Sequence, residues 1–187
     1  MAVNSFMVPL GTPAPAFALP SLEGRTVDPG EFAGRPMLVM FLSNHCPYVR
    51  HIERELGSLL AQYDDQDLGV VAISSNNVES HPDDGPTGLS EQVGRAGFTF
   101  PYLLDESQEI AKTYRAACTP DFFLYDERHR LAYRGEFDDS RPKNDLPVTG
   151  QALRMALDHV LTGKPVPEPH VPSIGCGIKW KPGNEPF

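Results

Sequence analysis

Hydrophobic residues recur along this chain with periods that change several times. Residues 37–42 (MLVMFL) form an unbroken apolar run, which predicts a strand that is buried on both faces. After Cys46 the apolar residues recur at steps of three and four as far as Tyr63, which predicts an amphipathic helix. Residues 68–75 (LGVVAISS) form a second apolar run. A strand, a helix and a strand of these lengths predict a right-handed parallel unit.

Shorter periodic segments follow this unit. We predict a short helix over residues 89–96, a strand over 101–104, a further helix up to Tyr114, a hairpin over 122–137 and a closing helix that ends at Gly163. This order of elements indicates an α/β protein in which helices cover both faces of a mixed sheet.

Two regions rich in proline, at the beginning and at the end of the chain, lack any such period. We predict loop and at most a short hairpin before residue 37, and we divide the chain into a domain (residues 1–163) and a tail (residues 164–187). The tail is extended, and it is ordered only if it packs on the domain. Residues 76–88, which include Asp84, are polar and predict a solvated surface loop.

Charge and hydropathy exclude several classes of function. The 187 residues include 16 basic and 25 acidic side chains, and the net charge of −9 has the wrong sign for a general nucleic-acid binder. The apolar runs are too short for a membrane-spanning helix. The first residues lack the basic start and apolar stretch of a secretory signal. We therefore expect a cytoplasmic protein with neither a nucleic-acid nor a membrane partner.

The three cysteines direct attention to thiol chemistry. Cys46, Cys118 and Cys176 are too few and too scattered for a disulfide scaffold, and their spacing does not fit a structural zinc site. We expect no metal and no cofactor. A cysteine in a reducing compartment is either buried filler or a reactive group, and its local context decides between the two.

Cys46 stands where the first buried strand changes into the first helix. Pro47 fits the first helical position, because the N–H that proline lacks has no partner inside a helix there. Cys46 is then the N-cap, and its sulfur would lie near the free amides of Tyr48 and Val49 at the positive end of the helix dipole. Those donors would favour the thiolate, which is the nucleophilic form.

Two neighbouring side chains, Arg50 and His45, would add positive potential around this sulfur. We therefore predict that Cys46 is a partly exposed nucleophile with a lowered pKa. The alternative, in which Cys46 only packs beneath the edge of the sheet, stays open.

A second feature, Thr119–Pro120, precedes the predicted hairpin. Proline in this place is compatible with a cis peptide bond in a tight turn. A cis bond would turn the carbonyl and the N–H of Thr119 outward as a template for an extended peptide. An ordinary trans proline at the start of a strand is the alternative.

Together, these features resemble the thioredoxin superfamily. A buried strand followed by Cys46–Pro47, and later Thr119–Pro120, are similar to its peroxiredoxin-like branch (alkyl hydroperoxide reductase and thiol-specific antioxidant, AhpC/TSA). Residues 11–20 (GTPAPAFALP) resemble the usual start of that branch, and residues 44–51 (NHCPYVRH) and 172–180 (PSIGCGIKW) resemble a subgroup labelled thiol-disulfide isomerase or thioredoxin family. The resemblance implies a thioredoxin-like α/β/α sandwich with a central mixed sheet, an amino-terminal extension and an extended carboxyl-terminal tail.

The same resemblance implies a thiol-disulfide oxidoreductase of antioxidant type, in which Cys46 matches the first cysteine of a thioredoxin. Val49 takes the place of the second cysteine, and typical peroxiredoxins carry their peroxide-attacking cysteine at that same place. The resolving thiol would then be a distant cysteine or a small-molecule thiol. Cys118 is the first candidate, because in this fold the segment before the cis-proline lies against the nucleophile, and Cys176 is the second.

The partner implied is a protein or small-molecule disulfide or thiol, with Thr119 and Pro120 binding its backbone. Two other classes of function stay open. One is a non-catalytic binding module or soft-metal carrier, in which all three cysteines meet. The other is a cysteine hydrolase, which would need a histidine base oriented against Cys46, whereas the neighbouring His45 points elsewhere if Cys46 caps the helix. A homodimer is also left open.

Overall fold

The centre of the fold is the strand–helix–strand unit that the apolar runs predict. In the computed structural model, which describes residues 2–186, β4 (Met37–Phe41) and β5 (Gly69–Ser74) are parallel and are joined by α1 (Pro47–Ala61). Every residue of β4 is buried. Because side chains alternate across a strand, β4 contributes Leu38 and Met40 to one apolar cluster and its remaining side chains to the other.

Three further strands complete the central sheet, whose order is β6-β5-β4-β8-β9. β6 (Tyr102–Leu104) is parallel to β5. β8 (Asp121–Tyr125) is antiparallel to β4, and β9 (Leu131–Gly135) is antiparallel to β8. The sheet is therefore mixed, as predicted, although the hairpin strand ends at Gly135 rather than at residue 137.

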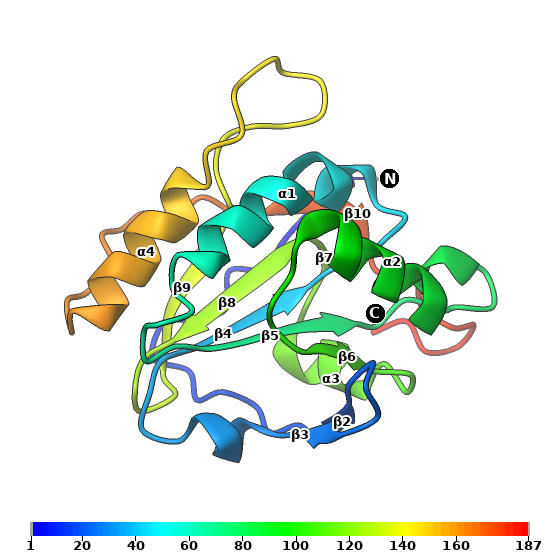
Figure 1. Ribbon diagram of the computed structural model, residues 1–187, viewed down its shortest axis with the longest axis horizontal. Coiled ribbons are helices and arrows are strands. Elements are labelled where there is room, and N and C mark those ends of the chain that lie inside the picture. Colours follow the sequence, from blue (N-terminus) through cyan, green and yellow to red (C-terminus); the bar gives the residue numbers. More distant parts are fainter. Residues whose placement is uncertain (1, 187) are drawn as a thin grey trace.

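Helices cover both faces of this sheet (Figure 1). The long helices α1, α2 (Pro86–Ala96) and α4 (Gln151–Leu161) pack on one face. The other face is covered by α3 (Glu109–Tyr114) and by the amino-terminal segment, which contains β2 (Leu19–Pro20), β3 (Thr26–Val27) and η1 (Pro29–Phe32). One more short helix, η2 (Pro82–Asp84), comes directly before α2. The predicted α/β/α sandwich is thus confirmed. Within residues 2–186, no helix is both long and apolar enough to cross a lipid bilayer.

A second, small sheet joins both ends of the chain to the middle of it. Its strands are β1 (Ala2–Asn4), β10 (Ile174–Gly177) and β7 (Cys118–Thr119), in the order β1-β10-β7 with antiparallel pairing throughout. The proline-rich tail therefore contains a strand that no apolar period predicts. This strand lies beside the segment that carries Thr119.

Candidate active site at the carboxyl end of β4

Cys46 lies where the sequence predicts, at the N-cap of α1 after the end of β4. Its backbone is extended (φ −71°, ψ 121°), and Pro47 occupies the start of the helix, which Tyr48 and Val49 continue. The side chain differs from the prediction. It is 0% exposed, and its Sγ donates a hydrogen bond to the carbonyl oxygen of Thr119 at 3.1 Å.

Two of our predictions for Cys46 are therefore wrong. The thiol is not partly exposed, and among residues 2–186 its side chain makes no capping hydrogen bond to the helix amides. The physical reason is β7, which places the Thr119 carbonyl within reach of the sulfur, so that the S–H points to this acceptor. A pattern local to residues 37–63 contains no information about a carbonyl more than 70 residues further along the chain.

The role of His45 and Arg50 as positive neighbours of the sulfur stays a prediction, and both side chains make further contacts in the loop before Cys46. The His45 Nδ1 atom lies 2.5 Å from Oδ2 of Asp84. The Arg50 Nε donates to the carbonyl oxygen of Asn44 at 2.5 Å. Both side chains thus hold the loop that precedes Cys46, and their polar atoms are engaged there.

Asp84 is the centre of this loop network. Its carboxylate is 0% exposed and accepts hydrogen bonds from the side chains of Ser43 and Asn76 and from the main-chain amides of Asn44 and His45. Burial raises the pKa of Asp84, but hydrogen bonds from His45 and Asn76 outweigh it, so that this pKa lies below its ordinary value. The prediction of a solvated loop is therefore wrong at Asp84, which anchors the loop to the site.

Cys176 lies directly opposite Thr119 in the β10–β7 ladder. Its side chain is half-buried and packs against the same apolar cluster that contains Cys46. Burial, hydrogen bonding with the Cys46 side chain and the charge of that thiol raise the pKa of Cys176 to about 11. The strand pairing therefore places a second sulfur beside Thr119, the residue whose carbonyl oxygen accepts the hydrogen bond of Cys46.

Cys118 faces away from this pair. Side chains alternate across a strand, and Cys176 is paired with Thr119, so that Cys118 projects from the opposite face of β7. The Cys118 thiol is 0% exposed and donates a hydrogen bond to the Pro120 carbonyl oxygen at 3.4 Å. The pKa of Cys118 lies well above its ordinary value, and burial is the largest cause. The charges of Asp121 and of the other two cysteines contribute in the same direction.

Asp121 is a second buried carboxyl at the site, and sequence reasoning missed it. It follows the Thr119–Pro120 peptide bond, which is cis, and is 0% exposed. Its Oδ2 accepts from the Ala117 amide at 3.1 Å, whereas Oδ1 has no hydrogen-bond partner within residues 2–186. Burial raises its pKa to about 8, against the opposing hydrogen bonds from main-chain amides. Burial therefore favours the protonated, uncharged form of Asp121 at neutral pH.

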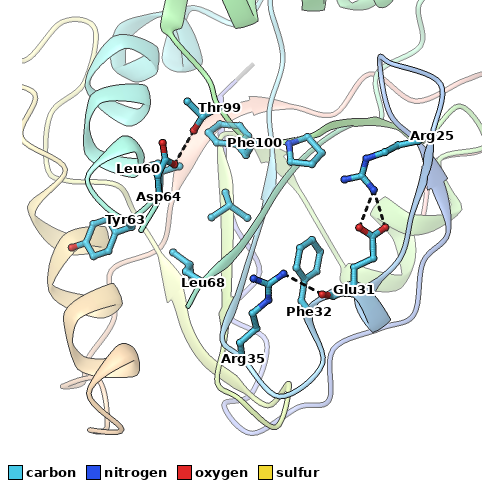
Figure 2. A pocket seen from close by; sticks show the side chains of 12 residues that line it. Arg25, Glu31, Phe32, Arg35, Leu60, Tyr63, Asp64, Leu68, Thr99 and Phe100 are labelled. Carbon is cyan, nitrogen blue, oxygen red and sulfur yellow. Dashed lines mark hydrogen bonds and ion pairs between the residues drawn. The ribbon is translucent and has the colours of Figure 1, made fainter. Parts of the chain in front are cut away.

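The buried Cys46 lines none of the clefts described for residues 2–186. A small cleft lined by Tyr48, Pro120, Ser173 and Ile174 among others has a volume of about 20 Å³, and a pocket of about 230 Å³ is lined by Asn76 and Asp84 among others. A larger pocket of about 270 Å³ lies at the opposite, amino-terminal end of the strands (Figure 2). Polar side chains of that pocket already bind one another, as in the ion pair of Arg25 with Glu31.

A metal site is not formed by these residues. Within residues 2–186, no group of three or more His, Cys, Asp or Glu side chains is arranged to hold a metal ion. The soft-metal alternative, which needs all three cysteines on one ion, thus finds no support in the described part of the chain. Cys118, on the far face of β7, is the thiol that fails to meet the other two.

A mixed sheet covered by helices, with a helix-starting cysteine hydrogen-bonded to the residue before a cis-proline at the end of two neighbouring strands, defines a protein of the thioredoxin fold. The sequence matches the AhpC/TSA family over residues 10–134, and the chain belongs to this family. The crystal structure of an uncharacterized conserved protein from Geobacillus kaustophilus is similar to this one, with a TM-score of 0.94 over 98% of each chain. The two sequences are 48% identical.

Two named relatives are more distant. A thiol:disulfide interchange protein of the thioredoxin family from Chlorobium tepidum has a TM-score of 0.63 at 14% identity, over 82% of this chain and 98% of that one, which shows a shared fold. Thiol-disulfide oxidoreductase ResA from Halalkalibacterium halodurans is 24% identical over 121 residues. The match covers 65% of this chain and 65% of ResA, so the chain spans about two thirds of that curated relative.

Proposed function

We propose that the protein is a thiol-disulfide oxidoreductase whose redox couple consists of Cys46 and Cys176. The observation that carries the proposal is the pairing of Cys176 with Thr119, whose carbonyl accepts the Cys46 hydrogen bond at 3.1 Å. Membership of the AhpC/TSA family and the similarity to ResA, which is named as a thiol-disulfide oxidoreductase, support this class of reaction.

The cycle consists of thiol–disulfide exchange steps that balance without a further oxidant. The Cys46 thiolate attacks one sulfur of a partner disulfide, forms a mixed disulfide and releases the other partner sulfur as a thiolate that takes up a proton. The Cys176 thiol loses its proton and attacks the Cys46 sulfur, which releases the second partner thiol. The product is a reduced partner and a Cys46–Cys176 disulfide, and two equivalents of an external thiol reduce that disulfide again.

The raised pKa of Cys176, for which burial is the largest cause, keeps this thiol protonated at neutral pH. In this proposal Cys176 therefore acts as the resolving thiol and not as the first nucleophile.

Cys176 is preferred here over Cys118, which our reading of the sequence placed first. Cys118 projects from the far face of β7 and donates to the Pro120 carbonyl, whereas Cys176 is paired with Thr119 and packs on the apolar cluster that contains Cys46. The Thr119–Pro120 segment holds the partner backbone in this proposal, and Pro47 fixes the start of the helix that carries Cys46.

Mild oxidation of the reduced protein with diamide is expected to link Cys46 to Cys176 and to leave Cys118 as the one free thiol. Peptide mapping by mass spectrometry after alkylation of the denatured protein measures the linkage. Cys118→Ser is the matched control, because it removes a buried thiol that the proposed cycle does not use. It should form the same disulfide, whereas Cys176→Ser and Cys46→Ser should form no internal disulfide.

Two results would contradict the proposal. One is a disulfide between Cys46 and Cys118 in the wild-type protein. The other is the absence of any internal disulfide under conditions in which oxidised glutathione modifies Cys46 in the Cys176→Ser variant.

A further inference from the structure

The tail strand β10 occupies the only sheet neighbour position of β7 among residues 2–186. In the order β1-β10-β7, β7 ends the small sheet, and its backbone pairs with β10 through Thr119 opposite Cys176 and Cys118 opposite Gly177. If β10 left, β7 would present unpaired main-chain groups beside Cys46. Such an edge binds an extended peptide by adding it as a strand.

The same strand keeps partners away from the nucleophile. Cys46 is 0% exposed, and the cleft between Tyr48 and Pro120 has a volume of only about 20 Å³ with Ser173 and Ile174 in its wall. A disulfide exchange step needs the attacking sulfur to meet the partner sulfur directly. An external disulfide therefore reaches Cys46 only after the segment around β10 has moved.

Contacts on both sides of β10 hold it in place. Before it, the Ser173 hydroxyl donates to the Pro120 carbonyl oxygen at 2.7 Å. After it, the Lys179 amide donates to Oδ1 of Asn76 at 2.7 Å, and the Gln108 side chain donates to the Lys179 carbonyl at 2.9 Å. The segment between Ser173 and Lys179 is thus a strap that is fastened at both ends across the active site.

Gly175 determines what can occupy this position. A Cβ on Gly175 would lie 2.0 Å from the Thr119 oxygen and 2.6 Å from the Thr119 carbonyl carbon, both of which are main-chain atoms of the site itself. Gly177 differs, since the nearest heavy atom to a Cβ there is a Val3 side-chain carbon at 3.7 Å. In this register, the occupant of β7 needs glycine immediately before its cysteine and tolerates a side chain after it.

We propose that Ile174–Gly177 is an internal occupant of β7, the edge on which the proposed function places the partner backbone, that it excludes partners from Cys46 until it is displaced, and that a partner segment bound there in the same register needs glycine immediately before its cysteine. This proposal rests on the proposed function. Cys46 then attacks the disulfide sulfur of the bound peptide cysteine, in the place where Cys176 lies in the closed form.

Gly175→Ala tests the strap in the full chain. The added methyl group cannot fit against the Thr119 carbonyl, so β10 should leave β7, and alkylation of Cys46 by iodoacetamide at pH 7.5 should accelerate by at least about tenfold. Gly177→Ala is the matched control and should stay within about twofold of the wild type. Peptide-resolved mass spectrometry measures the rate at each cysteine. Unchanged alkylation of Cys46 in Gly175→Ala would overturn the strap, as would equal acceleration at Cys46 and Cys118, which indicates general unfolding.

A peptide experiment tests the same binding edge without a substitution of Gly175 in the protein. Peptides with the sequence of residues 173–178 (SIGCGI) are prepared as mixed disulfides with glutathione, and their transfer to Cys46 is followed by intact mass in the Cys176→Ser protein, which cannot resolve the adduct. The parent peptide and SIGCAI should transfer at least about tenfold faster than SIACGI. Equal rates for all three peptides would overturn the proposed glycine requirement, while the disulfide mapping above would still decide the proposed function independently.

Discussion

Replacement of Asp121 by asparagine is expected to remove a large pH dependence from the stability of this protein. The wild-type carboxyl has a pKa of about 8 in the folded protein, because it is fully buried, against an ordinary value of 3.8. Between these two values the folded state holds a proton that the unfolded state has lost. The contribution of Asp121 to the free energy of unfolding is therefore fully present below about pH 4 and is lost as the pH rises through about 8.

The expected magnitude follows from the same linkage. Within this window, the free energy of unfolding of the wild type falls relative to that of Asp121→Asn by about 1.4 kcal/mol per pH unit. Urea denaturation at a series of pH values between about 4 and 8 measures it. Glu127→Gln, on the exposed turn after β8, is the control and should follow the wild type. Parallel curves for Asp121→Asn and the wild type would show that Asp121 is already ionised in the folded protein.

Removal of the Asp84 carboxylate is expected to lower the free energy of unfolding at pH 7 by about 3–5 kcal/mol, because it leaves buried donors without an acceptor. The donors of Ser43, Asn44 and Asn76 all point at this carboxylate, and His45 binds it at 2.5 Å. Urea denaturation of Asp84→Ala measures the loss. The variant should also loosen the loop that precedes Cys46.

The neighbouring residue supplies a matched control for Asp84. Asp83 is exposed, and the contact it makes with Asn44 uses its main-chain carbonyl, which Asp83→Ala preserves. That variant should change the stability by less than about 0.5 kcal/mol. The pH dependence of the Asp84 contribution has the opposite sign to that of Asp121. Its pKa is lowered in the folded state, so its contribution is present above about pH 4 and is lost at lower pH.

The large elements of the fold could be predicted because their signals are local. The apolar run of β4 and the three- and four-residue steps of α1 each reflect burial against a layer that the element itself specifies. β1, β7 and β10 could not be predicted in the same way. They have two to four residues each, and they are stabilised by pairing with segments that are distant in the sequence. β1 and β10, for example, are more than 100 residues apart.

The site shows the same division between local and distant causes. Cys46 and Pro47 could be placed at the start of α1, because a proline at the first helical turn is a local signal. The orientation of the sulfur could not, since it is determined by the Thr119 carbonyl on β7. Asp84 and Asp121 carry no sequence signal at all. One stands in a polar loop and the other begins an apolar strand, and only the three-dimensional contacts show that both are buried.

The position of β10 between β1 and β7 has a consequence for synthesis of the chain on the ribosome. Because Ala2–Asn4 pairs with Ile174–Gly177, β1 stays without this partner until about 170 further residues have been translated. The strands of the central sheet all precede residue 136, so the sheet can assemble earlier. A nascent protein at that stage would present its Cys46 thiol to the surroundings until β10 has been translated and has paired with β7.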